Sequence, residues 1–196
     1  MRASRPQQRP LPPKRFLPRL VRDTARRLTA PTEPEAFLRA VCETLSPRLD
    51  RPVRLKFVRF PPGLELSGVT FAKADEYVVV VEDGVPGHHK LVIAGHEFGH
   101  CYYRTLDVHY PGGLPTAVRS LLSRPDADVP WDRVIAMATR SPAATDPVAE
   151  WEAEECGLRL AAAFHKVIGP QATPGRPTQD TLTERLSSSL THLGGL

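Results

Sequence analysis

The segment KLVIAGHEFGHCYYRTL, residues 90–106, decides how the rest of this chain is interpreted. Its apolar periodicity and its lack of proline predict a helix, despite Gly95 and Gly99. Four residues of an α-helix turn through about 400°, so His96 and His100 project from the same face, one turn apart. Two imidazoles placed in this way can bind one cation.

Glu97 follows the first histidine directly and completes an H-E-x-x-H pattern. In this pattern both histidines bind Zn²⁺, and the glutamate is the general base toward the attacking water. The apolar residues 91–94 that precede the pattern do not fit a solvated helix face. We therefore expect His96 and His100 to be metal ligands and Glu97 to be the catalytic base.

A catalytic zinc site needs a third protein ligand and an open position for water. The metzincin extension would place a histidine six residues after His100, where the chain has Leu106, so that class is excluded. Asp107 and His109 are close in sequence but out of register with that extension, and each remains an alternative. The oxyanion-stabilising residue is not assigned either, because the sequence does not favour one of Tyr102, Tyr103 and His109 over the others.

A second helix offers other candidates for the third ligand. Asp146 and Pro147 form a helix start, and the segment that follows, to about residue 168, is rich in Ala, Leu and Glu. Glu150 and Glu154 lie one turn apart on one face of this helix. We expect Glu150 to be the third ligand, with Glu154 as the alternative; either could instead orient a histidine.

Periodicity upstream of residue 90 predicts the remainder of an α+β fold. A helix begins at Thr32 or Pro34, and a half-buried strand follows at residues 53–60. Two more strands are predicted at residues 65–73 and 76–82, joined as a hairpin or short meander. We expect a minimal zincin-like domain in which a small antiparallel sheet of about three strands packs on helices, including the helix at residues 90–106.

Charge is distributed unevenly along the 196 residues. Residues 1–27 carry a charge of +8, whereas the whole chain carries +4. We expect residues 1–30 to be a basic, Pro/Arg-rich leader that is largely disordered or loosely helical. Direct contact of this arm with nucleic acid is an alternative, and deletion of residues 1–27 would test it. Residues 31–196 are then a single domain with an insert at about residues 107–145, either a lid or docking element or a tolerated surface insertion.

Several function classes are excluded by composition. No apolar run reaches the roughly 20 residues that a membrane-spanning helix needs, and the basic N-terminus lacks the apolar core of a secretory signal. The three cysteines, Cys42, Cys101 and Cys156, share no close spacing and predict no disulfide framework. We expect a cytoplasmic protein without membrane partners. A C-terminal segment with Leu182 and Leu186 on one face predicts a further short helix.

Taken together, these features resemble the ImmA/IrrE family of bacterial metallopeptidases. The resemblance rests on the N-terminal helix, the short sheet, HEFGH at residues 96–100 and an E-x-E-A pattern from Glu150 to Ala153. It covers about residues 32–168, although Cys156 and Gly157 stand where members usually carry phenylalanine and alanine. The resemblance implies a zincin fold with the two histidines and Glu150 on zinc.

The same resemblance implies a role. Similar proteins cut DNA-binding repressors, and related chains are often labelled toxin components of toxin–antitoxin pairs. We therefore expect a zinc-dependent endopeptidase whose substrate is a helix-turn-helix repressor or antitoxin partner. The alternative is a non-catalytic, metal-containing regulatory protein that binds and sequesters a repressor. Substitution Glu97→Ala would separate the two, and a His/His/Glu site would also accept Mn²⁺, Co²⁺ or Fe²⁺.

Overall fold

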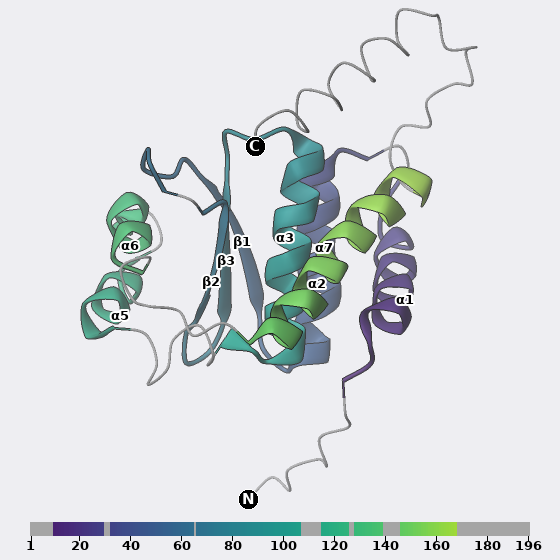
Figure 1. Cartoon of the computed structure of the whole chain (residues 1–196), viewed down its shortest axis with the longest axis horizontal. Coiled ribbons are helices and arrows are strands. Elements are labelled where there is room, and N and C mark those ends of the chain that lie inside the picture. The colour runs from purple at the N-terminus through teal and green to yellow at the C-terminus, as the bar shows by residue number, and fades with distance from the viewer. Residues whose placement is uncertain are drawn as a thin grey trace, which may run out of the picture.

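The computed structural model describes residues 10–29, 32–64, 66–106, 115–125, 128–138 and 146–167. Within these ranges the chain forms an α+β fold in which a three-stranded sheet lies between two groups of helices (Figure 1). One group comprises α1 (Pro13–Ala25), α2 (Pro34–Leu49), α3 (Gly87–Tyr103) and α7 (Pro147–Val167); the other comprises α5 (Thr116–Leu122) and α6 (Trp131–Ala138). The predicted α+β class, with a small sheet packed on helices, is confirmed.

The sheet is mixed, with the strand order β1-β3-β2. Strand β3 (Tyr77–Glu82) pairs in parallel with β1 (Val53–Val58) and antiparallel with β2 (Gly68–Ala72). The prediction of an antiparallel sheet is therefore right for β2 and β3 and wrong for β1 and β3. The reason lies in the sequence of β3, because residues 77–81 are all buried. A strand without polar alternation is covered on both faces, and it is placed at the centre of the sheet.

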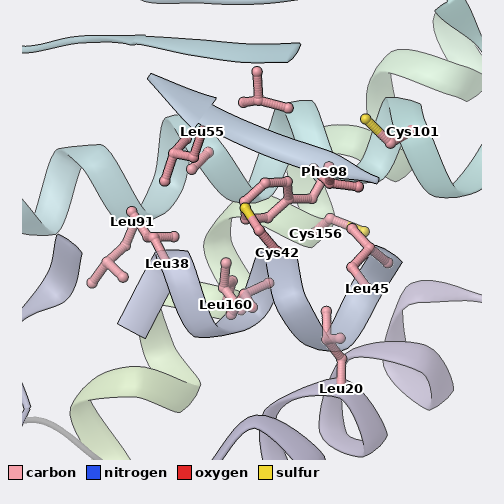
Figure 2. Packing of buried hydrophobic residues seen from close by; sticks show 14 of the residues in the cluster. Leu20, Leu38, Cys42, Leu45, Leu55, Leu91, Phe98, Cys101, Cys156 and Leu160 are labelled. Atoms are coloured by element: carbon pink, nitrogen blue, oxygen red, sulfur yellow. The ribbon is translucent and has the colours of Figure 1, made fainter. Parts of the chain in front are cut away.

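Alternate residues of β3 face two separate hydrophobic cores. Val79 and Val81 point toward the layer of α1, α2, α3 and α7, where they join the main core. Figure 2 shows that Leu38 and Leu45 of α2 join Leu91 and Phe98 of α3 in this core. The main core thus fixes α3 against the sheet.

The first helix belongs to the main core. Phe16, Leu17, Leu20 and Val21 of α1 are buried there, and α1 packs against α2 and α7. Residues 13–25, which we expected to belong to a largely disordered or loosely helical leader, instead form a helix that contributes to this core. The physical reason is that the four apolar residues form one face of the helix, while its arginines face solvent.

The second core lies on the opposite face of the sheet. It joins Val78 and Val80 of β3 to α5 and α6, with Val134 and Ile135 of α6 fully buried. Both helices fall within the expected insert at residues 107–145. Its described parts are therefore a structural layer that covers the sheet face opposite α3. None of the described helices is both long and apolar enough to cross a membrane.

Candidate metal centre

The two histidines of the H-E-x-x-H pattern lie on one face of α3, as their spacing predicts. Their Nε2 atoms are 2.9 Å apart. The His100 side chain is 3% exposed, whereas that of His96 is 27% exposed. Both rings therefore direct a nitrogen to one point at the edge of the core, and one side of that point is open to solvent.

A carboxylate from α7 reaches the same point. Asp146 caps α7 by accepting the backbone N–H of Val148 at 2.9 Å, which places Glu150 in the first turn. Glu150 Oε2 lies 3.6 Å from His96 Nε2, and its buried Oε1 lies 3.8 Å from His100 Nε2.

Within the described ranges, His96, His100 and Glu150 form a group that could hold a metal ion, since their ligand atoms all lie within 4.8 Å of one another. Glu154, the alternative ligand, is exposed and is not part of this group. Ala153 packs against Gly99 of α3. Glu154, the next residue, projects about 100° around the helix from Ala153 and therefore points away from α3. Asp107 lies outside the described residues.

Small residues let α3 and α7 approach closely. A Cβ atom on Gly95 would lie 2.8 Å from the Gly157 Cα, and one on Gly99 would lie 2.9 Å from the Ala153 Cα. Both distances are too short for real Cβ contacts, so these positions require glycine at this helix separation. In the sequence the two glycines of α3 stand out only as interruptions that a helix tolerates. The signal for their role was that each directly precedes a histidine of the pattern.

Glu97 is buried on the sheet side of α3. The Thr70 hydroxyl of β2 donates a hydrogen bond to its Oε2 at 2.7 Å. A Cβ atom on Gly68 would lie 2.9 Å from its Oε1, so the glycine leaves room for the carboxylate. Burial raises the pKa of Glu97 to about 7; the Thr70 hydrogen bond opposes this shift, and the Glu150 charge adds to it. Nothing in the sequence linked β2 to Glu97.

The other ring nitrogen of His100 also has a partner. His100 Nδ1 lies 2.8 Å from Thr105 Oγ1. Helix α3 ends at Tyr103, two residues before Thr105, because Arg104 adopts a left-handed conformation with φ 58°. No pattern in the sequence marks Thr105 as a partner of His100.

Two of the residues considered for oxyanion stabilisation have another role. Tyr102 accepts a hydrogen bond from the Leu11 backbone N–H at 3.1 Å, and Tyr103 donates one to the Leu11 carbonyl at 2.8 Å. Their hydroxyls thus hold the segment before α1 against the end of α3. The third candidate, His109, lies outside the described residues.

The chain matches no protein-family model, no curated protein and no solved structure. The chemistry of the site therefore rests on its own residues. These are two imidazoles and a carboxylate that converge on one point, and a buried carboxylate that lies beside the first histidine in the sequence.

Proposed function

We propose that this protein is a zinc-dependent peptidase that holds one Zn²⁺ ion at His96, His100 and Glu150. The observation that carries this proposal is the convergence of their ligand atoms within 4.8 Å. Two imidazoles and one carboxylate are a donor set typical of catalytic zinc, because three protein ligands leave a fourth position open. The burial of Glu150 Oε1 supports the fit, since a carboxylate shielded from water is stabilised by a nearby cation.

Bound zinc would supply Lewis acidity and would lower the pKa of water. In the proposed reaction Glu97 takes a proton from water as the hydroxyl adds to the peptide carbonyl. It then gives this proton to the leaving amine as the C–N bond breaks. The Thr70 hydroxyl fixes one oxygen of Glu97, which leaves the other oxygen to carry the proton.

The surface of α7 supports a polypeptide as the substrate. Val148, Trp151 and Leu158 are 59–66% exposed, and their spacing places them along one side of the helix. Large exposed apolar side chains are typical of surfaces that bind other proteins. Val148 shares the first turn of α7 with Glu150, and Trp151 follows directly, so this surface begins on the turn that carries the proposed third ligand. From the resemblance to ImmA/IrrE proteins, a helix-turn-helix repressor or antitoxin is the first substrate to test.

The experiment compares wild type, His96→Ala and Glu97→Gln for zinc content by elemental mass spectrometry and for cleavage of candidate repressors. We expect about one zinc per chain in wild type and in Glu97→Gln, and none in His96→Ala. Cleavage by Glu97→Gln should be slower by about 10²- to 10⁴-fold. Wild type without zinc would refute the metal site. Zinc together with repressor binding but no cleavage would favour the non-catalytic, sequestering alternative.

A further inference from the structure

We propose that Thr105 is a positioning residue for the metal ligand His100. Its hydroxyl accepts the proton on His100 Nδ1 and so leaves the lone pair of Nε2 for the metal. This inference rests on the proposed zinc site and identifies how the chain fixes one of its ligands. It is supported by the hydrogen bond between Thr105 and His100, by the burial of the His100 ring and by the way α3 ends.

The two nitrogens of the His100 ring have different roles. A neutral imidazole has one N–H group and one lone pair. His100 Nε2 faces Glu150 and His96, so it is the nitrogen that would bind the metal, and the proton must then be on Nδ1. Thr105 Oγ1 lies 2.8 Å from that Nδ1, a distance that fits a hydrogen bond.

Water has little access to the His100 ring. Only 3% of the His100 side chain is exposed, so a protein group must accept the Nδ1 proton in place of water. Without such an acceptor, the proton on Nδ1 would be buried and unpaired, and the ring would favour other orientations. His96 differs in this respect, because 27% of its side chain is exposed and water reaches part of it.

The backbone after α3 places Thr105 next to the His100 ring. Five residues of a continuous helix turn through about 500°, which would direct Thr105 well away from His100. Helix α3 instead ends at Tyr103, and the left-handed conformation of Arg104 turns the chain back. The backbone N–H groups of Arg104 and Thr105 both donate to the His100 carbonyl. One turn thus holds His100 at its carbonyl and at its ring.

The test measures the zinc dissociation constant of the full chain by competition with a chromophoric chelator. Thr105→Val keeps the shape of the side chain but removes the acceptor, and it should weaken zinc binding by about 10- to 100-fold. Thr105→Ser restores a hydroxyl and should return the affinity close to that of wild type. Thr44→Val is the matched control, because the Thr44 hydroxyl bonds the Ala40 carbonyl within α2 and touches no ligand. Its zinc affinity should equal that of wild type.

A second measurement reads the protonation of the His100 ring directly and begins with the wild type, whose fold is intact. In the zinc-loaded wild type, NMR of the histidine ring nitrogens should show a protonated Nδ1 on His100 whose proton exchanges slowly with water. This proton should exchange rapidly in Thr105→Val and slowly again in Thr105→Ser. A purely structural role would lower the melting temperature without changing this exchange.

The outcomes separate the two proposals. Wild type that binds no zinc would refute the metal site itself. Wild type that binds zinc, together with Thr105→Val of equal affinity, would refute the role of Thr105 and leave the metal site intact. An unprotonated His100 Nδ1 in the zinc-loaded wild type would also refute it.

Discussion

Gly99 of α3 lies so close to Ala153 of α7 that a Cβ atom on the glycine would be 2.9 Å from the alanine Cα. Gly99 directly precedes His100, and Ala153 lies one turn after Glu150. The distance between the two helices at this contact therefore determines how far the carboxylate of one helix lies from the imidazole of the other.

This contact predicts the effect of Gly99→Ala. The added methyl group must push α7 outward, which should lower the free energy of unfolding by about 1–3 kcal/mol and weaken zinc binding at least about tenfold. Urea unfolding and chelator competition measure the two effects. Gly87→Ala is the control, because it lies at the opposite end of α3 and meets only the side chain of Pro34. If Gly99→Ala were more stable than wild type, as alanine is in most helices, the close contact would not exist.

A second prediction concerns the carboxylates of α7. Glu150→Gln keeps the size of the side chain but removes its charge, and we expect zinc affinity to fall about 100-fold or more. Glu154→Gln makes the same change one turn later on an exposed residue and should leave the affinity unchanged. Isothermal titration of both variants with zinc checks this. Equal affinities for the two would place the third ligand elsewhere.

A third prediction concerns Lys90, which is buried at the start of α3. Its ammonium donates to Glu35 of α2 at 2.6 Å and to Asp83 at 2.7 Å, and it lies 4.7 Å from the centre of the Phe57 ring. Burial lowers the pKa of Lys90, but the hydrogen bonds to Asp83 and Glu35 outweigh burial and raise it. Its pKa is thus higher in the folded state. The stability that it contributes is present below the pKa of an unfolded lysine and is lost as pH rises through the folded value.

The two ways to break this cluster should differ. Glu35→Gln combined with Asp83→Asn leaves a buried ammonium without carboxylates, whereas Lys90→Met leaves two half-exposed carboxylates that water can solvate. We therefore expect the double variant to have the lower urea midpoint at pH 7. The reverse order would mean that the lysine is not held as a charged group.

The cysteines give a fourth prediction. Burial is the main cause that raises the pKa of Cys42 and of Cys156 to about 12, and it raises the pKa of Cys101 well above the usual range. All three thiols therefore stay protonated and shielded at pH 8. A thiol-reactive dye should label none of them in the folded protein and all of them in urea. Rapid labelling of the folded protein would contradict the packing of α2, α3 and α7.

Much of the site could be predicted from sequence because its signals are local. The spacing of His96 and His100 and the Asp-Pro start of α7 depend only on residues that are neighbours in the chain. The rules for hairpins account for the antiparallel pair that β2 and β3 form across a short turn, but they could not predict that β1 pairs in parallel with β3. Burial of β3 on both faces places it at the centre of the sheet.

The partners of the site residues could not be predicted for a related reason. Thr70 reaches Glu97 from another element, and no local pattern marks it. Thr105 reaches His100 because Arg104 takes a left-handed conformation, which sequence reasoning expects mainly of glycine or asparagine. Helix ends without glycine are therefore places where sequence patterns miss contacts.

Helix α1 determines what a truncation of the N-terminus would do to the protein. Arg15, Arg19 and Arg22 of the basic arm lie on the same helix as the core residues Phe16 and Leu20. A protein shortened to begin at residue 28 would lose part of its core along with its charge, and a failure to bind nucleic acid would then report unfolding. Arg15 and Arg19 are exposed, so exchanging them for glutamine removes charge and keeps the core. Point substitution, and not truncation, is the way to separate recognition from folding in this arm.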